Sequence, residues 1–123
     1  MRQINAYKET KQEIVAPRDM ERRIFERVTD QLRLADKEES RTEFFHRAVL
    51  ENRRLWAALA SDVVDPSNQM PNELKAGLLS LAIWVERESS SIHSGEATVA
   101  GLIEVNQALI AGLGAPSLTA EGD

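Results

Sequence analysis

The sequence predicts an all-α protein, a four-helix bundle with a short N-terminal helical arm. Apolar residues recur every three or four positions in successive segments, and capping residues, prolines and glycines separate these segments. No segment shows the alternation typical of a strand. With 123 residues, the chain has room for one domain with a real core. We therefore expect an arm at 1–17, a helical bundle domain at 18–114 and a flexible tail at 115–123.

The arm begins with a weak helical segment at about 5–14. Asn5 suits its N-cap, and Tyr7 and Ile14 fall roughly on one face. Pro17 is expected to end or redirect this helix. So short a helix is marginal alone, so the arm either docks on the bundle or stays mobile until a partner arrives.

The second segment, at about 18–37, shows a one-sided apolar stripe with a charged outer face. The stripe consists of Met20, Ile24, Val28, Leu32 and Ala35. Arginines and carboxylates alternate on the other side, a pattern typical of a solvated face.

The third segment opens with Ser40-Arg41-Thr42-Glu43, which has the pattern of a capping box. It runs to about Val64, where Asp65-Pro66-Ser67-Asn68 ends it. Its stripe contains Phe45, Ala48, Val49, Asn52, Leu55, Trp56, Leu59 and Val63.

The fourth segment, from Pro71 to about Ser91, is apolar on most sides. Leu74, Leu78, Leu81 and Val85 make one face, Leu79 and Ile83 lie opposite, and Trp84 lies on a flank. Because a helix that is apolar all round is usually buried, we expect this one at the centre of the bundle.

The fifth segment follows the turn at Ser94-Gly95 and runs over about 96–112. Its stripe contains Val99, Leu102, Ile103, Asn106, Leu109, Ile110 and Leu113. Gly112 and Gly114 are expected to stop the helix.

Charge separates the two halves of the chain. Up to Val64 there are 13 Lys and Arg against 12 Asp and Glu, whereas the remainder has 2 against 8, for a net charge of −5. Neither half carries the positive excess of a phosphate-binding surface, so we do not expect direct RNA contact.

The same composition indicates the cellular compartment of the protein. The N-terminus has no apolar run of the secretory kind, and the most apolar stretch, Leu74 to Val85, is too short to span a bilayer. The chain has no cysteine, which suits a reducing compartment. We expect a cytoplasmic protein without a membrane segment.

Catalytic and metal-binding patterns are weak. Glu43-x-x-His46 is half of a di-iron carboxylate motif, but no second copy follows. His93 lies near the end of the fourth segment, where a histidine suits the negative helix end. There is no nucleophile elbow, no phosphate-binding loop and no Cys/His pair. We expect no enzyme activity, no metal and no cofactor.

Four residues are candidates for protein binding: Tyr7, Trp56, Trp84 and Asn106. Asn52 and Asn106 each interrupt an apolar stripe, so their amides either join helices by hydrogen bonds or meet a partner at a groove. Tryptophans at such positions more often pack in the core than contact a partner protein. Tyr7 lies on an arm too short for a core of its own, so its use is contact with the bundle or a partner.

The landmarks of the chain, in order, resemble those of a known family. They are Asn5-Ala6-Tyr7 with Thr10; Asn52, Leu55-Trp56, Leu59 and Asp62; Asn68 with Met70-Pro71; Leu74-Lys75-Ala76; Leu81-Ala82-Ile83-Trp84-Val85; and Gly95, Leu102-Ile103, Asn106 and Gly112-Leu113. This set is similar to the flagellar protein FlaF family of alpha-class proteobacteria, over about 5–113. No landmark falls between Arg18 and Ser40.

The resemblance implies a role in flagellum biogenesis. FlaF-type proteins promote flagellin production and export, and they are linked to flagellin as a chaperone-like partner. They work beside FlbT, a regulator of flagellin messenger translation. A bundle groove suits the amphipathic terminal helices of flagellin. The alternative that the resemblance leaves open is a translational regulator acting on flagellin messenger, directly or through FlbT.

Overall fold

The computed structural model describes residues 11–114, which form four helices and, within that range, no strand. The helices are α2 (Lys11–Asp36), α3 (Glu43–Val63), α4 (Asn72–His93) and α5 (Ala100–Gly114). α2 packs between α3 and α5, and α4 packs mainly on α3. The predicted all-α bundle is confirmed. Among the described residues, no helix has the length and apolar character needed to cross a membrane.

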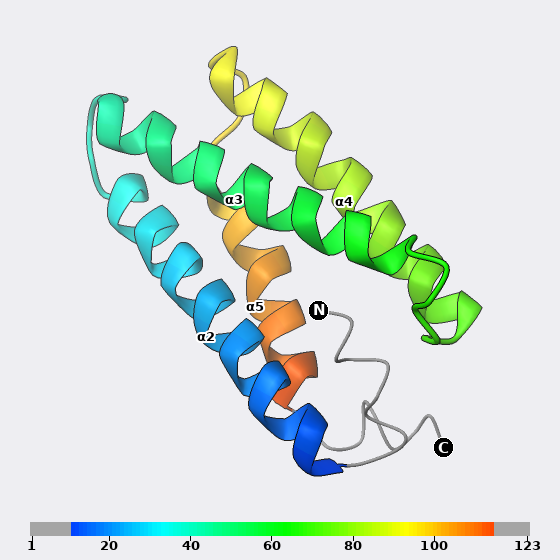
Figure 1. Ribbon diagram of the computed structural model, residues 1–123. Coiled ribbons are helices and arrows are strands. Elements are labelled where there is room, and N and C mark those ends of the chain that lie inside the picture. The colour runs from blue at the N-terminus through cyan, green and yellow to red at the C-terminus, as the bar shows by residue number, and fades with distance from the viewer. Residues whose placement is uncertain (1–10, 115–123) are drawn as a thin grey trace.

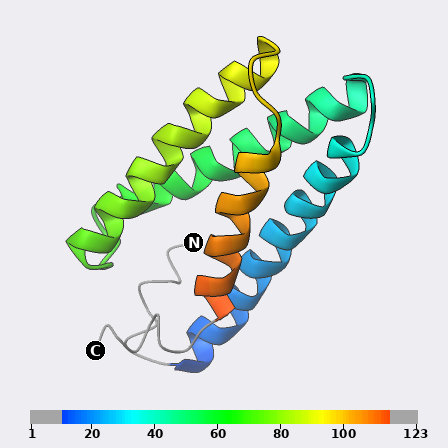
Figure 2. The ribbon, with the colours of Figure 1, turned by 180° about the vertical axis from the view of Figure 1, so that it is seen from behind.

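Helices α4 and α5 touch near the loop that joins them and then diverge. Figure 1 shows α4 following α3 while α5 runs down beside α2, and Figure 2 shows the same divergence from behind. The bundle therefore has two closely packed pairs, α2 with α5 and α3 with α4. One side of α4 consequently has none of the described helices along it.

Helix α2 begins at Lys11 and continues through Pro17, so the helix end predicted at Pro17 is wrong. A proline inside a helix removes one hydrogen bond and crowds the preceding turn, but a helix can accommodate it without ending. The part of the arm from 11 to 17 is thus the first part of α2. Residues 1–10, including Tyr7, lie outside the described residues.

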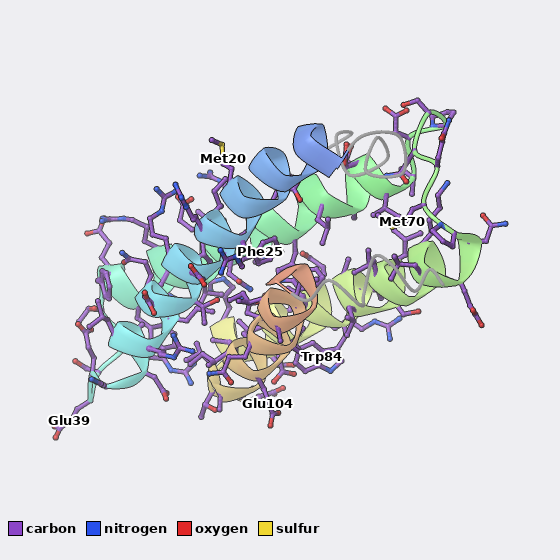
Figure 3. All side chains as sticks on the ribbon, turned by 90° about the horizontal axis from the view of Figure 1, so that it is seen from below. Met20, Phe25, Glu39, Met70, Trp84 and Glu104 are labelled. Carbon is purple, nitrogen blue, oxygen red and sulfur yellow. The ribbon has the colours of Figure 1, made fainter. Side chains whose placement is uncertain are left out.

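The buried side of α2 is rotated relative to the predicted stripe. Met20 is 61% exposed, whereas Phe25 and Thr29, which the stripe left out, are buried. Figure 3 shows Met20 pointing away from the bundle and Phe25 pointing into it. Steps of four residues advance by about 40° around a helix, so a stripe that begins at the exposed Met20 reaches the core-facing side only from Val28 onward.

Helix α3 is capped two residues later than the predicted capping box. Thr42 is its N-cap, and its hydroxyl oxygen accepts from the backbone N–H of Phe45 at 3.4 Å. Ser40 is used differently, because its carbonyl accepts from the Thr42 N–H in a tight turn. The helix ends at Val63, in agreement with the stop predicted at Asp65-Pro66.

The core lies between α2, α3 and α5, and α4 closes it from one side. Of the α4 side chains only Val85, Ser89 and Ile92 are buried. The prediction that the fourth helix is central is therefore wrong. It is an edge helix. Leu78 and Leu79 are partly buried against the core, and four large apolar side chains are exposed: Leu74, Leu81, Ile83 and Trp84. The pattern was apolar all round, but only one face meets the rest of the domain.

Candidate protein-binding surface

A buried polar network joins three helices at the centre of the core. The indole N–H of Trp56 on α3 donates to Asn106 Oδ1 on α5 at 2.8 Å. Asn106 Nδ2 donates to Asn52 Oδ1 on α3 at 2.8 Å and to Thr29 Oγ1 on α2 at 3.1 Å. All four side chains are almost fully buried. Asn106 thus meets partners on both other helices, as buried polar groups require, whereas Asn52 Nδ2 is buried without a hydrogen-bond partner among the described residues.

This network decides between the two interpretations of the asparagines. The interhelical hydrogen bond is confirmed, since Asn52 and Asn106 bond directly to each other. Trp56 and Asn106 therefore lie in the interior, with 1% and 0% of their surfaces exposed. Sequence reasoning missed Thr29, whose hydroxyl also donates to the carbonyl of Phe25 at 2.6 Å. Its spacing on α2 was the available signal, because it follows Phe25 by one turn.

A second cluster ties the α4–α5 loop to the start of α3. The guanidinium of Arg41 donates to the carbonyl of Ile92 and, at 2.6 Å, to the carbonyl of Ala97. It also lies over the ring of Phe45, 4.8 Å from the centroid. Arg41 thereby satisfies a carbonyl in the last turn of α4, where a positive charge is favourable. No periodicity pointed to this residue.

Beside Arg41, the two histidines of the chain stack on each other. The rings of His46 on α3 and His93 on α4 have centroids 5.4 Å apart and planes 15° apart. Partial burial lowers the pKa of His93, and the positive charges of His46, Arg53 and Arg41 lower it further. Among the described residues, no group of three His, Cys, Asp or Glu side chains is arranged to hold a metal ion.

A shallow hollow of about 230 Å³ lies on the outer side of the α3–α4 pair. It is lined by Arg53, Trp56, Ala57, Ala60, Leu79, Ala82, Ile83, Val85 and Glu86. Arg53 and Glu86 form an ion pair across the two helices, with Nε 3.3 Å from Oε1. Ile83, 55% exposed, borders the hollow.

A second apolar surface, which we call the α4 face, consists of Leu74, Leu81 and Trp84. Each is 37% exposed. It begins where Trp84 meets α5, because a Cβ added at Gly101 would lie 3.0 Å from Trp84 Cη2. From there it follows α4 away from the diverging α5 (Figure 1). Figure 3 shows Trp84 near the crossing of these two helices.

The four predicted binding residues thus have separate positions. Trp84 lies on the surface, Trp56 and Asn106 lie in the core, and Tyr7 lies outside the described residues. The structure does not bring Trp84 into the network of the other two. What the surface offers chemically is apolar area on an edge helix, which suits the binding of another apolar segment.

The comparisons with known proteins identify one family. The model of the family described as flagellar protein FlaF matches residues 3–113, which is nearly the whole chain. No curated protein and no solved structure matches it.

Proposed function

Because the chain belongs to the flagellar protein FlaF family and is thus a flagellum-related protein, we propose that it binds flagellin as a chaperone-like export factor and promotes flagellin synthesis. In this proposal it acts in the cytoplasm and is not an enzyme. The observation that carries the proposal is the position of α4, an apolar helix at the edge of the bundle with Leu74, Leu81 and Trp84 exposed on one side.

The exposed side chains of α4 support binding to a helical segment. A helix with apolar residues on most sides is normally covered on all of them, but among the described helices α4 packs along α3 and touches α5 only near the loop that joins them. Exposed apolar patches on soluble domains commonly mark protein-binding sites. The terminal segments of flagellin are amphipathic helices, which are the kind of ligand that such a surface accepts.

The proposal is tested by titrating purified flagellin into the full chain in a calorimeter. We expect saturable heat at micromolar concentrations with one site per chain. Circular dichroism before the titration checks that both proteins are folded. An absence of heat with both proteins folded contradicts flagellin binding.

The alternative, a regulator of flagellin messenger translation acting with FlbT, has one supporting feature. Arg23 and Arg27 are exposed on α2. However, Arg33 on the same helix pairs with Asp30 at 2.8 Å, and carboxylates alternate with the arginines throughout. A phosphate-tracking surface is therefore less favoured than a protein contact. A gel-shift assay at low salt with flagellin messenger tests direct RNA binding. The absence of a shift would exclude direct contact with the messenger.

A further inference from the structure

The α4 face has the geometry of a single helical stripe. Leu81 follows Leu74 by seven residues and precedes Trp84 by three. At about 100° per residue, the three side chains lie within about 80° of one another around the helix. Ile83 points to the opposite side of α4, where it borders the hollow with α3. The face is therefore distinct from that hollow.

Gly77 lies in the middle of this stripe. A Cβ added at Gly77 meets no described atom within 4 Å. Glycine is less favourable than alanine in the interior of a helix, and no neighbour in the described chain requires the small size of Gly77. A helix that packs on the α4 face would use it, because a missing side chain lets two backbones approach closely.

Carboxylates mark both ends of the stripe. Glu73 directly precedes Leu74. Glu88 follows Trp84 by one turn on the same side of α4, at the contact with α5, where its Oε2 would lie 3.4 Å from a Cβ added at Gly101. Neither carboxylate forms an ion pair or hydrogen bond with another described residue. The basic residues of α4 do not compensate them. Lys75 Nζ donates to the carbonyl of Asn68 at 2.7 Å, and Arg87 pairs with neither carboxylate among the described residues.

We propose that the α4 face binds an amphipathic helix whose apolar stripe has a lysine or arginine at each end. Glu73 and Glu88 are 15 residues apart, about 22 Å along the helix, so the two basic residues lie about four turns apart in the partner. The partner helix packs closest at Gly77. The inference rests on the proposed function, in which this helix is a terminal helix of flagellin.

The first test compares two apolar positions on opposite sides of α4. Leu81→Glu removes the centre of the face, and Ile83→Glu is the matched control, because Ile83 is the more exposed of the two. Purified flagellin is titrated into each full-length variant. We expect Leu81→Glu to weaken binding at least about tenfold and Ile83→Glu to change it less than about twofold. The reverse order would move the site to the α3–α4 hollow and overturn the inference.

The second test concerns charge. Glu73→Lys with Glu88→Lys is compared with Glu96→Lys with Glu104→Lys, which makes the same change in net charge elsewhere; Figure 3 shows Glu104 pointing outward from α5. We expect the first pair to weaken flagellin binding at least about tenfold at low salt, and the second pair to weaken it far less. Equal effects would mean that only net charge matters, which contradicts the placement of the basic residues.

The third test separates binding from folding. Gly77→Gln adds a polar, helix-compatible side chain at the closest point. We expect flagellin affinity to fall about tenfold while thermal stability stays equal to or above that of the wild type. Unchanged affinity would exclude close packing at Gly77. Light scattering of wild type and Leu81→Glu detects the competing occupant, since a dimer that this substitution dissociates would assign the face to a second copy of the chain.

A synthetic helix distinguishes failure of the inference from failure of the proposed function. The probe is an 18-residue amphipathic peptide, about five turns long, with a leucine stripe and lysines placed four turns apart. Its twin carries glutamates in their place. If the wild type binds the lysine peptide and not flagellin, the α4 face is a helix-binding site, but flagellin is not its partner. If flagellin binds, but the peptide does not bind and the variants do not change flagellin affinity, the proposed function is supported and the α4 face is not the binding site.

Discussion

The indole N–H of Trp56 donates to Asn106 Oδ1 at 2.8 Å, joining α3 and α5 although their backbones do not pack side by side. The link is possible because a tryptophan side chain is long and an asparagine can accept and donate at once. Asn106 uses its other atom to reach Asn52 and Thr29. One side chain thus connects all three helices that enclose the core.

Replacing Asn106 with leucine should lower the free energy of unfolding by on the order of 3 kcal/mol. The substitution leaves the Trp56 N–H without an acceptor and Asn52 Oδ1 without a donor, and each buried unpaired group costs about 1–3 kcal/mol. Urea denaturation measures the change. Gln107→Leu, at an exposed neighbouring position, is the control. A loss below about 0.5 kcal/mol would mean that the network does not stabilise the fold.

Replacing Arg41 with alanine should destabilise the protein by about 1–2 kcal/mol, because charge-assisted hydrogen bonds to the carbonyls of Ile92 and Ala97 are lost. Amide hydrogen exchange should quicken at 92–97. Arg47→Ala is a matched control. Among the described residues Arg47 pairs only with the exposed Glu43, at 3.2 Å, so its loss should cost less than about 0.5 kcal/mol. An equal loss of stability in the two variants would show that Arg41 does not anchor the α4–α5 loop.

Two helical glycines should respond oppositely to alanine. Gly77→Ala should raise the free energy of unfolding by about 0.5–1 kcal/mol, because the new methyl group enters open space and alanine favours a helix. Gly101→Ala should give no such gain, since its Cβ would lie 3.0 Å from Trp84 Cη2. Thermal unfolding of both variants makes the comparison. A similar gain at both positions would show that Trp84 moves aside freely.

Stability should fall in mild acid through His93. Its pKa in the folded protein is lowered from the ordinary value of 6.5 by partial burial and by His46, Arg53 and Arg41. Between the lowered pKa and 6.5 the unfolded chain therefore binds more protons, so the free energy of unfolding decreases as pH falls through this window. Above 6.5 this contribution does not change with pH.

The measurement for this effect is urea denaturation at a series of pH values, together with an NMR titration of the His93 ring. His93→Gln should flatten the pH dependence over the window while leaving the carboxylate titrations at lower pH in place. A His93→Gln variant with the slope of the wild type would exclude His93 as its origin.

Much of the fold was predictable because helix signals are local. The end of α3 at Asp65-Pro66 and the turn at Ser94-Gly95 follow from residues that act on their own backbone, and Gly95 indeed has a φ of 82°. The hydrogen bond between Asn52 and Asn106 was predictable in kind, since a buried amide must find a partner. Which atoms meet was not predictable from a linear pattern.

The sequence by itself determined that the chain is helical, where most helices end, and which stripes contain polar residues. Only the tertiary structure decided that α4 is an edge helix, that Trp56 is in the core and Trp84 at the surface, and that Thr29 completes the network. The physical reason is that periodicity reports that a helix has an apolar side, whereas burial depends on which other helix covers that side. For α4, α5 diverges toward α2, and Leu74, Leu81 and Trp84 remain exposed.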